Sequence, residues 1–281
     1  MSTPNILTDT RPMIDGERPD VANSIITDAW GLHFAQGGVV MAAGLRAMEA
    51  VLDRPDLSLA SASATFCRPV ACGPVSTTVE VLRDGRRGSQ VLGDLRVPGD
   101  DGTNVSLTAV FTDPSLPGPT DTPLPRPVEL LDPPPADAPP VWMESAYPLG
   151  FLDNTEWKTA SSGASAPAHD PVHRLAVWFR FTDPPAAPDA DWDPALLPIP
   201  GDSLGSALIV ALGGGERPVG SVSLQIGIQV FRPMRGTWIG VDSTCTHIAN
   251  GLASGVLNLW SAAGEHVATV TQTAMLRSLS D

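Results

Sequence analysis

The chain of 281 residues is poor in cysteine. Its three cysteines are an odd number, and no two of them have the Cys-x-x-Cys spacing of a zinc or redox motif. Cys67, Cys72 and Cys245 therefore provide neither a disulfide framework nor a metal site, and we expect unreactive buried thiols. The histidines lack a third ligand at a useful spacing, so we expect no metal and no cofactor.

Basic residues are also scarce. The chain has one lysine, Lys158, and its 17 basic against 31 acidic residues give a formal charge of −14. Nucleic-acid binding needs clustered cations, so we expect no such partner. Arg83, Arg86 and Arg87, around an Asp84-Gly85 turn, could still contact the phosphates of one small molecule, although a solvated hairpin tip explains them as well.

Long apolar runs are missing. No run approaches the roughly 20 residues that a membrane-spanning helix needs. The first five residues, Met-Ser-Thr-Pro-Asn, have neither the basic nor the apolar region of a secretion signal. We therefore expect a cytoplasmic protein without a membrane span. The hydrophobic share of 42% and the seven tryptophans are enough for a sizeable core.

The most informative feature is an internal repeat. Its first copy begins with an apolar helical stretch from Gly38 to Leu52, which has apolar residues at three- and four-residue spacings. Four segments rich in β-forming residues follow, separated by turn dipeptides such as Asp84-Gly85 and Asp101-Gly102. These segments predict an antiparallel meander over residues 59–69, 77–82, 90–97 and 105–111.

The second half repeats this order. A helical stretch begins near Asp202 and ends near Leu212, and strand-like segments cover 222–233, 238–244, 252–260 and 266–277. Arg68-Pro69 and Arg232-Pro233 lie 164 positions apart (232 − 68), as do the helix starts Gly38 and Asp202 (202 − 38). The common offset indicates duplication of one unit, in which a sheet curls around a helix and buries its apolar stripe.

A proline-rich segment separates the two copies. Proline fixes φ and removes a hydrogen-bond donor, so residues 113–170 are predicted to form an extended connector. The strand-like segment His173–Phe181 opens the second copy. We therefore predict an N-terminal half over 1–112, a connector over 113–170 and a C-terminal half over 171–281.

This arrangement resembles the double-hotdog acyl-CoA thioesterases of the thioesterase II type. The resemblance implies an α+β protein of two tandem hotdog folds, each a curved antiparallel sheet wrapped around one long helix. It implies acyl-CoA as the substrate and, because one chain then equals a hotdog dimer, further pairing into a homo-oligomer. It is carried by the segments Phe34–Val40, Ser63–Pro69, Ser223–Pro233, Asn250–Gly255 and Val267–Arg277.

The resemblance also implies a catalytic group. The family uses an acid at the start of the second helix, a hydroxyl on the next strand and a glutamine on the last strand. The matching residues are Asp202, Ser223 and Gln272. Threonine is more usual at the hydroxyl position, and close relatives have an acid where this chain has Gln225. Gly38 replaces the acid in the first copy, so we expect one active site.

These residue types suit the hydrolysis of a thioester by water. A carboxylate can accept a proton from water, and a hydroxyl and a carboxamide can orient it. Gly37 and Gly38 are predicted to bind substrate, with backbone N–H groups at a helix start facing the oxyanion. By residue type alone, Asp202 could instead be an N-cap. Ser223 and Gln272 could be ordinary strand residues.

Two other functions remain open. A binding module could hold acyl-CoA or another hydrophobic ligand without hydrolysing it. A hotdog enoyl-CoA hydratase would use Asp28 and His33, which are spaced as in Asp-x-Asn-Pro-x-His, although Trp30-Gly31 replaces Asn-Pro.

Overall fold

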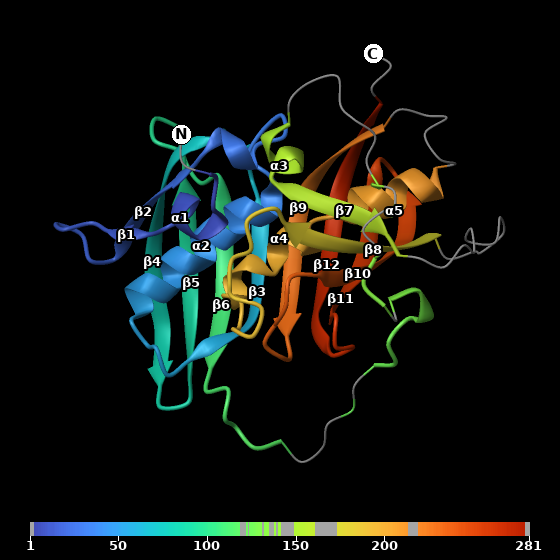
Figure 1. Cartoon of the computed structure of the whole chain (residues 1–281). Helices are drawn as coiled ribbons and strands as arrows, with labels where there is room; N and C mark the ends of the chain where they lie inside the picture. The colour runs from blue at the N-terminus through green and yellow to red at the C-terminus, as the bar shows by residue number, and fades with distance from the viewer. Residues whose placement is uncertain are drawn as a thin grey trace.

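The computed structural model describes residues 3–118, 122, 124–130, 132–134, 138, 140–141, 149–160, 173–212 and 219–278. Within these ranges the strands form one twelve-stranded sheet in the order β1-β2-β4-β5-β6-β3-β9-β12-β11-β10-β8-β7. All pairs in it are antiparallel. The first six strands in this order come from the N-terminal half and the last six from the C-terminal half (Figure 1).

The N-terminal half wraps its strands around one long helix, as predicted. This helix, α2, begins one residue earlier than expected and is buried over most of its length, because residues 37–45 have no polar or charged side chain. The elements of this half are α1 (Ile6–Asp9), β1 (Met13–Ile14), β2 (Val21–Ile26), η1 (Asp28–Trp30), α2 (Gly37–Leu52), β3 (Ser58–Phe66), β4 (Gly73–Gly85), β5 (Gly88–Arg96) and β6 (Val105–Thr112).

The C-terminal half departs from the prediction in its helix. Instead of one helix from Asp202 to Leu212, the chain forms two short helices that meet at Asp202, whose φ of −88° and ψ of 56° leave the helical region. The elements here are α3 (Gly150–Asp153), β7 (Thr155–Thr159), β8 (His173–Phe181), η3 (Pro194–Leu196), α4 (Pro198–Gly201), α5 (Leu204–Ala211), β9 (Val219–Val230), β10 (Ile239–Ala249), β11 (Leu252–Ser261) and β12 (His266–Ser278).

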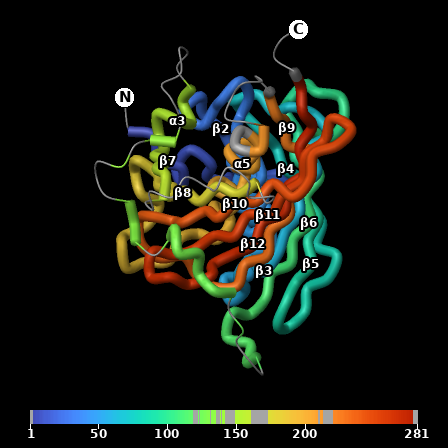
Figure 2. The backbone as a smooth tube through the Cα atoms, turned by 90° about the vertical axis from the view of Figure 1, so that its right-hand side faces the viewer, coloured from blue at the N-terminus to red at the C-terminus, as the bar shows by residue number. Residues whose placement is uncertain are grey.

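The two halves join where β3 pairs with β9. Ser63 lies opposite Gly227 in this ladder, and the two residues are 164 positions apart (227 − 63), the offset of the repeat. Two equivalent residues that face each other in an antiparallel pair define a local two-fold axis between the copies. Figure 2 shows the strands of both halves following one another around the molecule.

The helices of the two halves meet inside the curved sheet. α2 contacts α4 and η3 of the other half, and α2 and α4 lie side by side in Figure 1. Gly38 permits this approach, because a Cβ there would lie 2.3 Å from the carbonyl oxygen of Pro198. None of the helices in the described ranges is long and apolar enough to cross a membrane.

The predicted connector is not extended throughout. Residues 113–170 include α3 and β7, and β7 extends the sheet by pairing with β8. Part of the connector docks through η2 (Val128–Leu130) on the outer face of the C-terminal half. There Leu130 fills the hollow above Gly240, whose strand neighbours are Trp178 and Trp260. Residues 119–121, 135–137 and 161–170 of this segment lie outside the described residues.

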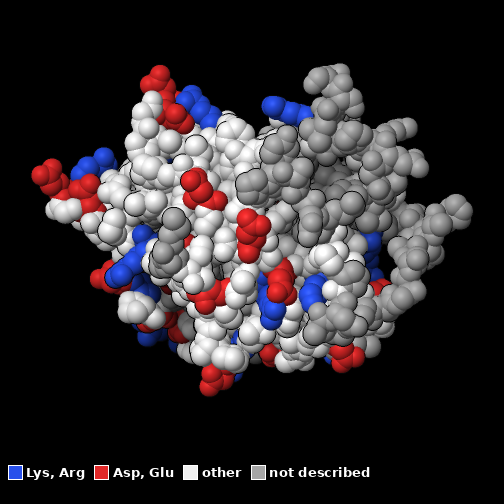
Figure 3. Space-filling view, turned by 45° about the horizontal axis from the view of Figure 1, so that its top comes forward, with Lys and Arg blue, Asp and Glu red and all other residues white. Residues whose placement is uncertain are grey.

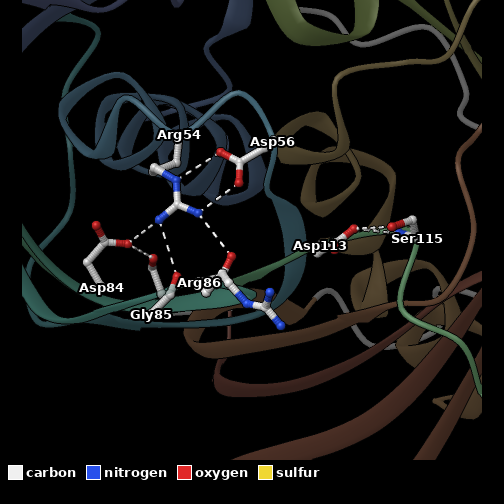
Figure 4. A network of polar contacts seen from close by, with 8 residues as sticks. Arg54, Asp56, Asp84, Gly85, Arg86, Asp113 and Ser115 are labelled. Atoms are coloured by element: carbon white, nitrogen blue, oxygen red, sulfur yellow. Dashed lines mark hydrogen bonds and ion pairs between the residues drawn. The ribbon is translucent and has the colours of Figure 1, made fainter.

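The β4–β5 hairpin turns two residues later than predicted. Its ladder continues to Gly85 and Gly88, so Arg86 and Arg87 form the turn instead of Asp84-Gly85. Arg54 closes this end by donating to the Asp84 carboxylate and to the carbonyl oxygens of Gly85 and Arg86, while it also pairs with Asp56 (Figure 4). Arg83, Arg86 and Arg87 are exposed, which favours the solvated hairpin tip.

Candidate active site

Three side chains predicted to be catalytic converge at the corner between α4 and α5. Asp202 Oδ1 accepts hydrogen bonds from Ser223 Oγ at 2.8 Å and from Gln272 Nε2. Asp202 Oδ2 accepts from the backbone N–H of Gly38, at 2.9 Å, in the other half of the molecule. The carboxylate is therefore surrounded by donors, and it does not serve as an N-cap of α5 through any bond in the described residues.

A β-bulge directs Ser223 into the site. In a regular strand Ser223 and Gln225 would point to the same face. Here Ser223 lies opposite Ala274 and Gln225 opposite Thr273, so Leu224 is an extra residue in β9. Bulges of this kind re-aim a side chain next to a site. Ser223 consequently points inward to Asp202, and Gln225 points outward, where its Nε2 donates to Ser63 Oγ at 3.3 Å.

Gln272 is held in one orientation. Its Oε1 accepts from the backbone N–H of Leu204, the first residue of α5, at 3.1 Å. The amide group must then face the other way, where it donates to Ser223 Oγ at 2.8 Å and to Asp202. The side chain is only 5% exposed. Gln272 thus links a helix start on one side to the carboxylate on the other.

The pKa of the Asp202 carboxyl group is raised towards neutral pH. Burial raises the pKa of Asp202 from 3.8 to about 6, and the hydrogen bonds from Ser223, Gly38 and Gln272 oppose this shift. A carboxylate with such a pKa is ionised at pH 7 but still basic enough to accept a proton from a polarised water. A carboxylate in this arrangement, with two polar side chains at its edge, is chemically able to accept a proton.

The two glycines at the start of α2 have a structural purpose. A Cβ at Gly37 would lie 2.6 Å from Asp202 Oδ2, and one at Gly38 would meet the backbone of α4. The N–H of Gly38, which the sequence suggested for a substrate oxygen, is bonded to Asp202. In this arrangement the N–H of Gly38 already has a partner, and its contact with substrate stays a prediction. A Cβ at Gly37 would also lie 3.5 Å from the Phe66 ring, so Gly37 is close to this side chain as well.

The pair proposed for a hydratase gains no support. Asp28 lies in η1 and His33 is exposed, and no contact in the described ranges joins them. The described residues also contain no group of three histidine, cysteine or acidic side chains that could hold a metal. On the face seen in Figure 3, acidic and basic side chains are scattered, and no broad basic patch is visible there.

One residue at the site was not singled out from the sequence. Gln36 precedes the two glycines, caps α2 and reaches across to the backbone of Ile199 and Asp202. A polar residue just before a predicted helix is the usual sign of an N-cap. Its second set of partners lies more than 160 positions away and could not be foreseen from that sign.

Comparison with known proteins assigns both halves. A model of the acyl-CoA thioesterase N-terminal domain matches residues 26–112, and a model of the acyl-CoA thioesterase C-terminal domain matches residues 127–276. A search of the curated proteins gave no significant match.

Several solved structures share the fold over almost the whole chain. An acyl-CoA thioesterase II from Mycobacterium marinum is 21% identical, with 98% of this chain and 99% of that one covered and a TM-score of 0.72. A conserved protein with a hot dog fold from Alicyclobacillus acidocaldarius is 18% identical, with 99% of both chains covered and a TM-score of 0.77. A tesB protein from Mycobacterium avium subspecies paratuberculosis is 19% identical, with 97% and 98% covered and a TM-score of 0.72. The predicted tandem hotdog architecture is confirmed.

Proposed function

The chain belongs to the acyl-CoA thioesterase family and is a thioesterase, and we propose that it hydrolyses acyl-CoA to the free acid and CoA by direct attack of water. Asp202 is the general base, and Ser223 and Gln272 orient the water. The observation that carries this proposal is that Ser223 from β9 and Gln272 from β12 both donate to one carboxylate oxygen of Asp202, the residue that follows α4.

The proposed reaction has two steps. Asp202 accepts a proton from the water while the water oxygen forms a bond to the thioester carbon, giving a tetrahedral oxyanion. The carbon–sulfur bond then breaks, and the CoA thiolate takes the proton from the carboxyl group of Asp202. Ser223 and Gln272 contribute by holding the water in the attacking position, which replaces a random encounter by an oriented one.

The oxyanion requires a donor other than the N–H of Gly38. The start of α2 carries the partial positive charge of a helix N-terminus, which favours negative charge nearby. Gly37 and Gly38 both lack a side chain between the backbone and the site, and the N–H groups of both lower the pKa of Asp202. We assign the oxyanion contact to this turn, where the positive end of the helix as a whole, and not one named N–H group, stabilises the negative charge.

The test measures the release of free CoA from acyl-CoAs of increasing chain length, for the wild type and for Asp202→Asn. Loss of a positioned general base should lower kcat by about 10²–10⁴-fold. Asp28→Asn is the matched control, because it makes the same change at the acid of the hydratase hypothesis and should leave the rate unchanged. Equal rates for wild type and Asp202→Asn would reject Asp202 as the base.

Two further results distinguish the alternatives. Tight binding of acyl-CoA without hydrolysis at any chain length would identify a binding module. Loss of enoyl-CoA absorbance that depends on His33 would identify a hydratase.

A further inference from the structure

We propose that Gln36 is a positioning residue of the active site, whose amide group ties the start of α2 to the α4–α5 corner and so holds Asp202 against Ser223 and Gln272. The kinetic part of this inference rests on the proposed function. Gln36 touches none of the reacting atoms. It acts through the backbone of the residue that we assign as the base.

The carbonyl end of the Gln36 side chain is engaged within its own half. Gln36 is the N-cap of α2, and its Oε1 accepts from the backbone N–H of Val39 at 2.8 Å. This bond satisfies one of the free N–H groups of the first helical turn. It also determines the orientation of the amide, because the NH₂ group must then point away from α2.

The NH₂ end crosses to the other half. Nε2 lies 3.3 Å from the carbonyl oxygen of Ile199 and 3.4 Å from that of Asp202. Both carbonyls lie at the end of α4, where helical carbonyl groups lack partners within the helix. The Gln36 side chain is 4% exposed, so neither water nor another group can easily replace these bonds.

Asp202 is consequently held from both sides by the start of α2. The backbone N–H of Gly38 binds the Asp202 carboxylate, and the Gln36 side chain binds the Asp202 backbone. The break between α4 and α5 leaves this residue without regular helical bonds on its C-terminal side. Without the Gln36 amide, the corner can rotate, and the carboxylate loses the alignment that Ser223 and Gln272 require.

The contact made by Gln36 has no counterpart in the second copy of the repeat. The position equivalent to Gln36 in the second copy is Pro200 (36 + 164), which has no side-chain donor. The start of α2 can therefore hold the acid of the second half, and the second half has no corresponding group to hold the first. This asymmetry agrees with a single catalytic acid, at Asp202 and not at Gly38.

The experiment combines a direct titration with kinetics. Gln36→Met removes the donors and the acceptor at nearly constant length, and Gln225→Met is the matched control on the exposed outer face. The ionisation of Asp202 is followed by NMR in protein labelled with ¹³C at the aspartate carboxyl carbons, with Asp202→Asn used to assign the signal. Opening the corner to water lowers the pKa of Asp202, and loss of the Ser223 and Gln272 hydrogen bonds raises it. Because burial is the largest cause of the shift, the Asp202 titration in Gln36→Met should move down towards 3.8. Gln225→Met should titrate as the wild type does.

Kinetics gives the second readout. Gln36→Met should lower kcat about tenfold or more, with little change in KM, since misalignment acts on the attack and not on binding. Gln36→Glu is a second variant, for use if Gln36→Met does not fold. It keeps an acceptor for the N–H of Val39 and loses both donors to the α4–α5 corner. Its added charge can shift the pH profile, so the rates are compared on the kcat plateau above pH 8, which lost positioning should lower.

The outcomes separate the two proposals. An unchanged Asp202 titration in Gln36→Met, or a wild-type kcat plateau in Gln36→Glu, overturns the role of Gln36. Absence of thioester hydrolysis by the wild type instead rejects the proposed function, and the titration still decides whether Gln36 positions Asp202.

Discussion

The backbone N–H of Gly38 donates to Asp202 Oδ2 at 2.9 Å, although the two residues are separated by 164 positions. That separation is the repeat offset, so equivalent positions of the two halves meet at the local two-fold axis. A second acid at position 38 would lie against the first, where two like charges disfavour each other's ionised form. The geometry of the duplication thus favours one acid at this position over two, in agreement with the proposal that Asp202 is the single catalytic acid.

Gly38→Ala should damage both folding and catalysis. The added Cβ would lie 2.3 Å from the Pro198 carbonyl oxygen and 2.7 Å from Ile199 Cα, and the backbone atoms must move to make room. Overpacking of this kind costs about 1–3 kcal/mol of unfolding free energy. Thermal unfolding and CoA release check this. Gly16→Ala is the control, because nothing lies within 4 Å of a Cβ there. Equal losses at both positions would contradict the explanation.

The thioesterase rate should depend on a group that titrates near pH 6. Burial raises the pKa of Asp202 to about 6, and only the ionised form can accept a proton from water. A pH series should therefore show kcat/KM falling about tenfold per unit below pH 6. Ser223→Ala removes a hydrogen bond that lowers this pKa, so its acid limb should lie at higher pH. A limb that stays in place would argue against the Ser223 contact.

Gln272→Glu should be more harmful than its small change in shape suggests. A carboxylate can still accept from Leu204, but it cannot donate to Asp202 and places a second negative charge beside it. Both effects raise the pKa of Asp202 and remove a water-orienting amide. We expect CoA release at pH 7 to fall by about 10²-fold. Gln229→Glu, on the exposed side of β9, serves as control. Similar rates for the two variants would be the opposing result.

Glu49 on α2 should make stability depend on pH. Burial and then the neighbouring charge of Asp193 raise the pKa of Glu49 to about 7, while Arg46 acts in the opposite direction. A folded-state pKa above the unfolded value means that the contribution of Glu49 to stability is fully present below about pH 4.5 and is lost as the pH rises towards 7. Glu49→Gln should therefore raise Tm at pH 8 and have little effect at pH 4. An equal change in Tm at both pH values would exclude this cause.

Leu130→Ala should loosen the connector from the sheet. Leu130 is fully buried between Trp178 and Trp260, so its truncation leaves a cavity above Gly240. Cavities of this kind cost about 2–5 kcal/mol of unfolding free energy. Urea unfolding measures this loss, and Val128→Ala provides the comparison because Val128 is 70% exposed. A wild-type midpoint for Leu130→Ala would show that the docking contributes nothing to stability.

The sequence by itself determined the repeat, the antiparallel strands and the long first helix. These features are local: β8 has the predicted bounds, and the Asn250-Gly251 turn has the positive φ values of 54° and 74° that this dipeptide favours. The resemblance to a family supplied the three site residues. Their types and positions were visible, but their contact was not.

Tertiary structure decided how the site is assembled. Only the pairing of β9 with β12 shows the bulge at Leu224 that turns Ser223 inward, and only the meeting of two helices shows that Gly38 and Gln36 hold Asp202. It also converted part of the predicted connector into β7, whose partner strand lies beyond residue 170. The physical reason is common to all three. Each depends on hydrogen bonds or close contacts between segments far apart in the chain, and such contacts leave no periodic pattern in the residues that make them.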